Sequence, residues 1–372
     1  MLKPGGHGTG LFGADEYAQM RAFFDARPAL RPTPMRNLPA LAGSLGIGSL
    51  SLKDETHRFG LNAFKLLGAR FAVETLLTEG VLRAGDTVVC ASEGNHGRAV
   101  ARAARDASCA ARVYMAHDVA ASRVDAIAGE GADVIKVDGS YDDAVRVAEA
   151  EARTHGWTVV SDTAWEGYER IPRLIMLGYT RMMEEQFRDP ESGDPKPGRD
   201  SGSLIPDPDV VFVQGGVGGL LCGVASWWAF HRRERRPRIV CVEPTSAACL
   251  QASARAGTPV AVTGPLNTTM AGLRNREVSP LAFEAALPIV DAFMSIDDVW
   301  AHEAMKTLSR PHASDPPIAA GASGAAALGG LLALCGDNAF EDARGALRLS
   351  PESRVLAIVS EGVTDPGLWR DI

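Results

Sequence analysis

A regular alternation of strand-like and helix-like segments, most evident from Asp86 onward, constrains the fold more than any other feature of the chain. In the first half, the strand-like segments are 86–92, 112–116, 133–137 and 157–161, and the helix-like segments are 66–77, 95–106, 121–131 and 141–155. In the second half, the strand-like segments are 210–214, 238–243 and 355–360, and the helix-like segments are 167–186, 218–230, 246–256 and 321–334. A run of βα units predicts an α/β fold with mostly parallel sheets and helices on both faces.

Length and charge limit the classes of function. A chain of 372 residues most often folds into two domains. The net charge of -8 argues against a nucleic-acid partner, because surfaces that bind nucleic acids are usually basic. No apolar run reaches the roughly 18 residues of a membrane span. The first ten residues lack the apolar core of an export signal, and the six cysteines form no CxxC pair, so we expect a cytoplasmic protein without a metal site or a membrane partner.

Lys65 stands at the start of an apolar helical segment, directly after Phe64. A lysine in apolar surroundings is costly to bury unless it has a use. Once desolvated, it is a good amine nucleophile toward aldehydes. The ordinary alternative is a lysine that extends its charged end to solvent.

The segment 92–97 (SEGNHG) follows a predicted strand and opens a predicted helix. Its glycines allow close approach of the backbone, and free amides at a helix N-terminus bind carboxylate or phenolate oxygens. The ordinary alternative is a helix cap formed by Ser92 or Asn95.

A second glycine-rich segment, 214–219 (QGGVGG), lies between a strand and a helix. Such a loop can surround a phosphate with backbone N–H groups, although it lacks the lysine of a P-loop. It also has a weak likeness to the dinucleotide fingerprint, with Glu243 as the acidic residue 25 positions after Gly218. An NAD-dependent oxidoreductase therefore stays open as an alternative.

Further polar residues follow two other strands. Asp162 comes after the strand at 157–161, and Ser360 and Thr364 come at the end of the last strand. Ligands of open α/β sheets bind at the carboxyl ends of strands. The ordinary alternatives are a helix cap for Asp162 and a simple turn for 360–364. The five features together supply an amine, an anion site, a phosphate loop, a carboxylate and a hydroxyl, which pyridoxal 5'-phosphate (PLP) requires.

At these residues the sequence resembles the fold-type II PLP enzymes of the tryptophan synthase β-like family, most closely the diaminopropionate ammonia-lyases. The likeness runs from about Arg31 to Asp365. It is carried by the segments 53–55 (KDE), 58–65 (RFGLNAFK), 94–98 (GNHGR), 123–127 (RVDAI), 141–143 (YDD), 162–168 (DTAWEGY), 171–172 (IP) and 270–273 (MAGL). The resemblance implies two open, twisted, mostly parallel sheets, with the active site in a cleft between two domains. We expect a large PLP-binding domain at 1–60 and 165–372, interrupted by a surface loop at 187–208, and a small α/β domain at 61–164.

The resemblance also implies which residues bind the cofactor. Lys65 would hold PLP as a Schiff base and shuttle protons, and Phe64 would pack beside the ring. Asn95 would bond the phenolate oxygen. Ser360, or Thr364 in its place, would face the ring nitrogen. The phosphate would be held by the backbone of Gly215, Gly216, Val217, Gly218 and Gly219.

For catalysis, the resemblance implies α,β-elimination of a small amino acid, D- or L-2,3-diaminopropionate, to pyruvate and ammonia in a homodimer. Asp162 would contact the substrate, together with Ser92, Gly94 and His96. Glu93 stands where the family usually has an aspartate, which is thought to be a second proton acceptor for the D-isomer.

A second departure from the family is Ala322, which stands where a glutamate is usual. Both departures leave the substrate open. The alternatives are a serine or threonine dehydratase, another lyase for β-substituted amino acids, and an amino-acid sensor that has kept the fold without catalysis.

Overall fold

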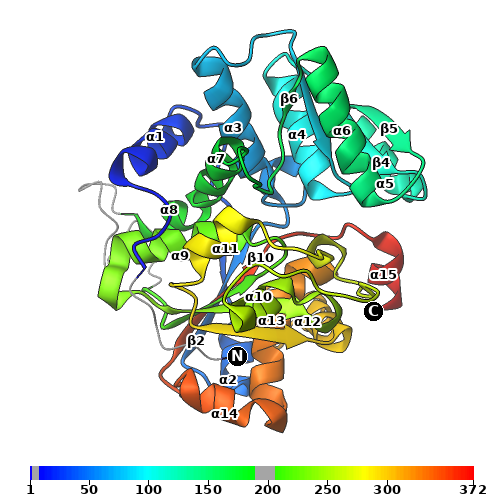
Figure 1. Cartoon of the computed structure of the whole chain (residues 1–372). Helices are drawn as coiled ribbons and strands as arrows, with labels where there is room; N and C mark the ends of the chain where they lie inside the picture. Colours follow the sequence, from blue (N-terminus) through cyan, green and yellow to red (C-terminus); the bar gives the residue numbers. More distant parts are fainter. Residues whose placement is uncertain (2–7, 189–205) are drawn as a thin grey trace. The chain divides into compact units, whose positions relative to one another are not determined.

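The computed structural model describes residues 1, 8–188 and 206–372 (Figure 1). These residues form two compact units. The larger unit joins Met1–Ala63 to Thr180–Ile372, and the smaller unit is Phe64–Tyr179. Most of the surface loop predicted at 187–208 lies outside the described residues.

The larger unit contains a six-stranded sheet with the order β1-β2-β10-β7-β8-β9. Its strands are β1 (Met35–Asn37), β2 (Ser49–Asp54), β7 (Val210–Gln214), β8 (Arg238–Pro244), β9 (Ala292–Ile296) and β10 (Arg354–Val359). β1 is antiparallel to β2, and every other pair is parallel. Because parallel strands place their carboxyl ends at one edge, the residues after β7 and β10 lie at the same edge of this sheet.

Ten α-helices accompany this sheet in the described residues. They are α1 (Ala14–Asp25), α2 (Pro39–Ser44), α8 (Arg181–Phe187), α9 (Gly219–Arg232), α10 (Cys249–Ala256), α11 (Pro280–Ala286), α12 (Asp298–Ser309), α13 (Ala322–Gly336), α14 (Glu341–Ala346) and α15 (Pro366–Asp371). α13 is buried along nearly its whole length and packs across β7, β8, β9 and β10. A side chain at Gly330 would meet Val242 of β8 at 2.7 Å, so glycine permits this close approach.

The smaller unit contains a four-stranded parallel sheet with the order β5-β4-β3-β6. Its strands are β3 (Thr87–Ala91), β4 (Ala110–Ala116), β5 (Asp133–Val137) and β6 (Thr158–Val159). Its helices are α3 (Leu66–Thr78), α4 (Asn95–Asp106), α5 (Ala121–Ala128), α6 (Tyr141–His155) and α7 (Arg170–Tyr179). Helices and strands alternate, as the sequence predicted.

Two glycines bring α3 and α7 into backbone contact. A side chain at Gly68 would lie 2.6 Å from the Ile175 carbonyl oxygen, and one at Gly178 would lie 2.6 Å from the Leu67 carbonyl oxygen. The packing of α7 on α3 places α7 in the smaller unit, whereas the sequence-based boundary at 164/165 assigned it to the large domain. The single helix predicted at 167–186 is also divided, because α7 ends at Tyr179 and α8 begins at Arg181.

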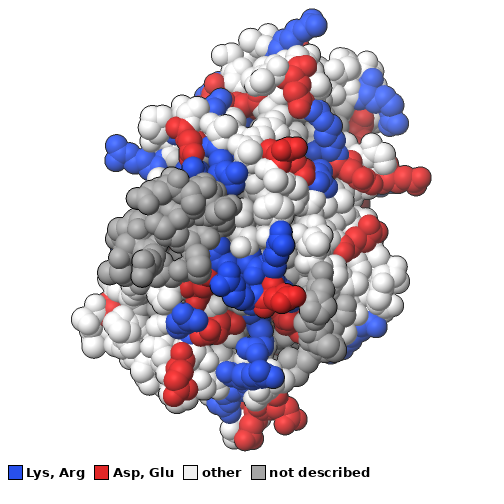
Figure 2. Space-filling model, turned by 90° about the vertical axis from the view of Figure 1, so that its left-hand side faces the viewer, with Lys and Arg blue, Asp and Glu red and all other residues white. Residues whose placement is uncertain are grey.

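Acidic and basic side chains lie among one another on the face shown in Figure 2, as on an ordinary solvated surface. Among the described residues, no helix is both long and apolar enough to cross a bilayer.

Candidate active site

Lys65 and Asp162 form an ion pair in the smaller unit. Lys65 directly precedes α3, and its Nζ donates a hydrogen bond of 2.5 Å to Asp162 Oδ2. The side chains are 22% and 17% exposed, so the predicted alternative of a lysine extended into solvent is wrong. Burial alone would lower the pKa of Lys65, but the Asp162 carboxylate outweighs burial and holds the pKa above its usual value. Burial raises the pKa of Asp162, but the neighbouring Lys65 ammonium helps to outweigh burial, so the pKa lies below its usual value and the carboxylate stays charged.

His96 adds a third polar group beside this pair. Its Nε2 lies 2.9 Å from the Val160 carbonyl oxygen, and because a carbonyl only accepts, this nitrogen carries the hydrogen. Its Nδ1 is buried without a hydrogen-bond partner and lies 3.7 Å from Asp162 Oδ2. Burial lowers the pKa of His96, with Asp162 opposing the shift. The neutral ring therefore presents an acceptor nitrogen beside the Asp162 carboxylate.

The turn after β6 fixes Asp162 in this position. The Tyr168 hydroxyl donates to the Val159 carbonyl oxygen at 2.8 Å and accepts from the Ser161 amide at 2.9 Å. The Tyr168 ring also stacks on Trp165, with ring centroids 4.0 Å apart. The segment 161–168 is thus a closed turn, and since α7 begins only at Arg170, the predicted alternative of a helix cap for Asp162 is wrong.

The segment 92–97 follows β3 and opens α4, whose first three residues it includes, as the sequence predicted. The Ser92 hydroxyl oxygen accepts hydrogen bonds from the amides of Gly97 (2.9 Å) and Gly94 (3.4 Å), so Ser92 caps the start of α4. Glu93 and Asn95 are half-buried, and Asn95 is the first residue of the helix. The polar groups of this segment therefore gather at the helix N-terminus, where an anion is favoured.

Phe64 and Tyr179 place two aromatic rings near the Lys65 amine. Their rings pack edge to face with centroids 4.7 Å apart, and Lys65 Nζ lies 5.2 Å from the Phe64 centroid and 5.7 Å from the Tyr179 centroid. Tyr179 was not singled out from the sequence, because it lies inside a segment that reads only as a helix. The one available signal was the pair of glycines in two apolar helices, Gly68 and Gly178, which marks their close crossing.

The glycine-rich loop lies in the larger unit, between β7 and α9. Gly216 and Gly218 have φ values of +66° and +101°, which favour glycine. The carbonyl oxygens of the loop are turned toward the protein: that of Gly216 accepts from Cys249 Sγ, and that of Val217 accepts from the Ser279 amide at 2.8 Å. With its acceptors occupied and a 14-residue helix beginning at Gly219, the loop has the form of an anion site.

Glu243 beneath this loop does not support the dinucleotide alternative. It is fully buried, and its carboxylate oxygens accept from the amides of Leu250 (2.9 Å) and Gln251 (2.8 Å) at the start of α10. A side chain at Gly215 would meet Glu243 Cγ at 2.5 Å. Glu243 therefore supports the loop and a helix end, and it is not presented to a ribose.

Ser360 directly follows β10, at the same edge of the sheet as the glycine-rich loop after β7. Its residue exposure is 4%, whereas Thr364 is exposed. The geometry therefore favours Ser360 over Thr364 as the hydroxyl of the site.

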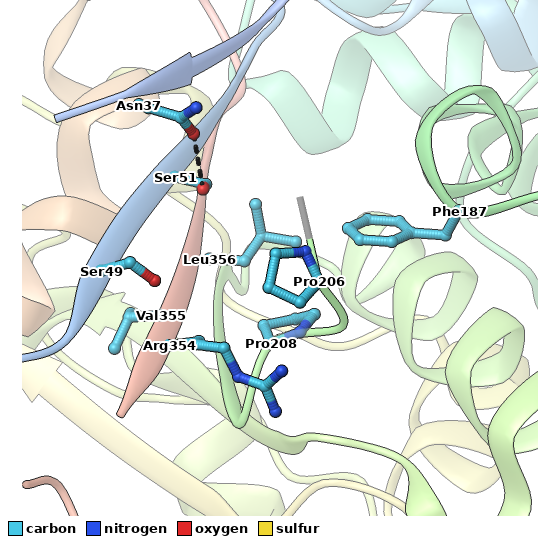
Figure 3. A pocket seen from close by; sticks show the side chains of 9 residues that line it. All are labelled: Asn37, Ser49, Ser51, Phe187, Pro206, Pro208, Arg354, Val355 and Leu356. Atoms are coloured by element: carbon cyan, nitrogen blue, oxygen red, sulfur yellow. Dashed lines mark hydrogen bonds between the residues drawn. The ribbon is translucent and has the colours of Figure 1, made fainter. Parts of the chain in front are cut away.

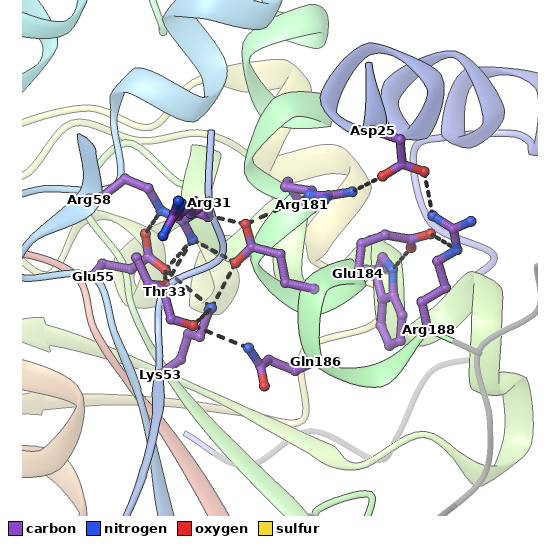
Figure 4. Close-up of polar contacts among 12 residues, drawn as sticks. Asp25, Arg31, Thr33, Lys53, Glu55, Arg58, Arg181, Glu184, Gln186 and Arg188 are labelled. Atoms are coloured by element: carbon purple, nitrogen blue, oxygen red, sulfur yellow. Dashed lines mark hydrogen bonds and ion pairs between the residues drawn. The ribbon is translucent and has the colours of Figure 1, made fainter. Parts of the chain in front are cut away.

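A buried ion cluster in the larger unit anchors the segment that leads into Lys65 (Figure 4). Arg58 contacts Glu55 at 2.6 Å and Glu185 at 2.7 Å, and Lys53 contacts Glu185 at 2.8 Å. These four side chains are 0% exposed and their charges balance. Burial raises the pKa of Glu185, but Arg58 and Lys53 outweigh burial and hold the pKa well below its usual range. Residues 55–58 are thus held firmly, a few positions before Lys65.

A pocket of about 160 Å³ in the larger unit lies apart from these groups (Figure 3). Its lining includes Ser49 and Arg354, the first residues of β2 and β10. It therefore lies toward the amino ends of these strands, opposite to the edge that carries the glycine-rich loop and Ser360. Ligands of such sheets bind at the carboxyl ends.

The structure thus groups the predicted site residues in two sets. The smaller unit holds Phe64, Lys65, Ser92, Glu93, Gly94, Asn95, His96 and Asp162, and the larger unit holds Gly215, Gly216, Val217, Gly218, Gly219, Ser360 and Thr364. Among the described residues, no three His, Cys, Asp or Glu side chains are arranged to hold a metal ion.

Comparison with known proteins identifies the family. Residues 26–361 match the family model described as pyridoxal-phosphate dependent enzyme. The chain is 35% identical to the diaminopropionate ammonia-lyase of Escherichia coli (strain K12), over 99% of this chain and 93% of that protein. It is 28% identical to a biosynthetic L-threonine dehydratase of the same organism, over 86% of this chain but 56% of that protein.

A solved structure agrees with this result and confirms the predicted fold class. The crystal structure of the Escherichia coli diaminopropionate ammonia-lyase with an aminoacrylate-PLP azomethine reaction intermediate superposes with a TM-score of 0.86 at 35% identity, covering 100% of this chain and 93% of that chain. The chain therefore belongs to the family of pyridoxal-phosphate-dependent enzymes, in the branch that contains the diaminopropionate ammonia-lyases.

Proposed function

We propose that this protein catalyses the PLP-dependent α,β-elimination of 2,3-diaminopropionate to pyruvate and ammonia. The observation that carries the proposal is the Lys65–Asp162 pair in a half-buried site, within a chain similar to these lyases along 99% of its length. The threonine dehydratases are more distant, so they are the second choice.

The residues present fit the cofactor. The loop of Gly215 to Gly219 could not carry a side chain at Gly215 without a clash, and it ends in a helix N-terminus suited to a phosphate. Lys65 Nζ would hold the aldehyde covalently, beside the ring of Phe64. Asn95 would bond the phenolate oxygen, and Ser360 would face the ring nitrogen. When bound, PLP supplies an electron sink for the pair left on the substrate Cα.

The protein's own groups would move the protons. With its amine free, Lys65 would accept the Cα proton of the L-isomer at Nζ. Asp162 accepts a hydrogen bond from this amine and so orients it. The Asp162 carboxylate and the acceptor Nδ1 of His96 together would also bind an ammonium group of the substrate. Departure of the β-amino group as ammonia needs a proton, which the newly formed Lys65 ammonium can return. Ser92 and Gly94 lie at the α4 N-terminus, where the substrate carboxylate would be favoured.

The decisive experiment compares wild-type protein with Lys65→Ala. The wild type should show a visible cofactor band and release pyruvate from 2,3-diaminopropionate faster than from serine or threonine. After borohydride reduction, mass spectrometry should find a pyridoxyl group on Lys65. Lys65→Ala should lose the band, the adduct and the activity, whereas Lys306→Ala, at an exposed lysine, should keep all three.

A colourless wild-type protein without an adduct would refute the proposal. Faster release from serine or threonine would favour the dehydratase alternative. Cofactor binding without turnover of any of these amino acids would favour the sensor.

Glu93 is proposed as the second proton acceptor, used for the D-isomer. Glu93→Gln should then reduce kcat/KM for D-2,3-diaminopropionate more than for the L-isomer. Equal losses for both isomers would remove this role.

A homodimer, which the resemblance implies, and a cytoplasmic location, which the first ten residues and the cysteines led us to expect, stay predictions. Light scattering of the purified protein tests the first.

A further inference from the structure

One buried polar group of the smaller unit has no part in the function proposed above. Tyr179, the last residue of α7, is 0% exposed, and its hydroxyl has no hydrogen-bond partner in the structure. Buried hydroxyls are nearly always hydrogen-bonded, so an unpaired one needs an explanation.

The surroundings of this hydroxyl point to Lys65. Lys65 Nζ lies 5.7 Å from the centroid of the Tyr179 ring, which packs on the neighbouring Phe64. Burial raises the pKa of Tyr179 and the Lys65 ammonium opposes this shift, so the two groups are close enough to act on each other. In the structure, however, Nζ is turned toward Asp162.

The position of Tyr179 is built into the helix packing. The backbones of α3 and α7 touch at Gly68 and Gly178, one residue before Tyr179. A side chain at Gly68 would meet Tyr179 Cε1 at 2.6 Å. The crossing therefore holds the tyrosine ring directly over the start of α3, where Lys65 lies.

We propose that Tyr179 is a positioning residue whose hydroxyl is the second hydrogen-bond partner of Lys65 Nζ, beside Asp162. This inference rests on the proposed function, in which Nζ accepts the Cα proton. A neutral primary amine has two N–H donors and one lone pair. When Asp162 and Tyr179 accept hydrogen bonds from the two N–H groups, the orientation of the amine is fixed. Its lone pair then points in a single direction, and the substrate Cα–H must lie in that direction. The Cα–H bond breaks, an N–H bond forms at Nζ, the electron pair stays with the substrate, and Tyr179 keeps its proton.

The test variant is Tyr179→Phe, which keeps the ring that packs on Phe64 and removes only the hydroxyl. Tyr17→Phe is the matched control. Tyr17 is also 0% exposed with an unpaired hydroxyl, but it lies in the larger unit against Phe230 and His231. Since neither hydroxyl has a hydrogen-bond partner in the structure, both variants should fold, and the thermal midpoint of each is measured to check this.

The first measurement is turnover. For Tyr179→Phe we expect kcat to fall by about tenfold or more while KM changes less than about twofold, because the lost contact orients the base in the transition state. Tyr17→Phe should match the wild type in both constants.

The second measurement needs neither cofactor nor turnover. Acetic anhydride acetylates the neutral form of a lysine, and mass spectrometry of the cofactor-free chain gives the rate at Lys65, with exposed Lys306 as the internal reference. Tyr179 adds to the effects that raise the pKa of Lys65. Its hydroxyl stabilises the charged form, so Tyr179→Phe should acetylate Lys65 several-fold faster at mildly alkaline pH. Tyr17→Phe should not change the rate.

A Tyr179→Phe variant with the wild-type kcat, or with the wild-type acetylation rate at Lys65, would overturn the inference. If the wild type itself forms no adduct at Lys65, the proposed function fails, and this outcome is distinct because it does not depend on Tyr179.

Discussion

The contact between α3 and α7 predicts that Gly178→Ala destabilises the smaller unit. The added methyl group would lie 2.6 Å from the Leu67 carbonyl oxygen, 2.8 Å from Gly68 Cα and 3.0 Å from the Leu67 carbonyl carbon. All three are backbone atoms of α3, so no side chain can rotate away. To move from 2.6 Å to an ordinary contact at 3.4 Å, the helices must separate by about 0.8 Å.

The magnitude follows from two opposing effects. Overpacking of this kind costs about 1–3 kcal/mol, and alanine gains back about 1 kcal/mol over glycine as a helix former. The free energy of unfolding should therefore fall by up to about 2 kcal/mol. Gly43→Ala in α2 is the matched control, because no atom lies within 4 Å of its added methyl group. That variant should be more stable than the wild type by up to about 1 kcal/mol.

The assay is urea unfolding read by hydrogen exchange of peptides from α3 and α7. A local signal is needed because a chain with two compact units does not have to unfold in one step. Gly178→Ala should lose protection in both helices at lower urea than the wild type. For Gly43→Ala the same reading is taken on peptides of α2, where the midpoint should be at or above that of the wild type. A midpoint of α3 and α7 in Gly178→Ala at or above that of the wild type would refute the packing argument.

Three other predictions follow from buried polar groups. Burial raises the pKa of Glu243 from its usual 4.5 to about 8, so the folded chain holds a proton that the unfolded chain releases. The contribution of Glu243 to the free energy of unfolding is thus largest below pH 4.5 and is lost as the pH rises through about 8, so the difference in urea stability between the wild type and Glu243→Gln should change over this range. Glu185→Leu, which leaves the buried cluster with one uncompensated positive charge, should cost about 3–5 kcal/mol in urea unfolding, whereas Arg112→Ala at an exposed pair should cost less than about 1 kcal/mol. Tyr168→Phe should loosen the turn at Ser161, seen as faster proteolysis there and a lower kcat.

The elements that could be predicted from the sequence are those with local signals. α6 begins after Ser140, whose side chain caps the helix in a reciprocal box with Asp143, and it ends at Gly156 with φ +69°. Its bounds at 141–155 match the prediction, as do those of β5 and β7. Lys65, Asp162 and the glycine-rich loop could likewise be recognised from their residue types and from their places after strands.

The elements that could not be predicted depend on distant contacts. β2 carries Lys53, a charged residue whose buried partners include Glu185, 132 positions along the chain. The predicted helix at 167–186 begins late, because Tyr168 closes a turn on β6 before α7 starts. Tyr179 lies near Lys65 because α7 packs on α3, and no local sequence pattern predicts that packing. The role of Glu243 beneath the loop depends on α10, which folds back on it.

The order of strands in the larger sheet has a consequence for how the chain is made. β10 is the last strand to leave the ribosome, yet it lies between β2 and β7, which do not pair with each other. Until residues 354–359 emerge, this sheet is therefore split into two parts with unpaired edges, the kind of surface on which nascent chains aggregate. All four strands of the smaller sheet lie within residues 64–179. The smaller unit can therefore fold before β10, the central strand of the larger sheet, has been synthesised.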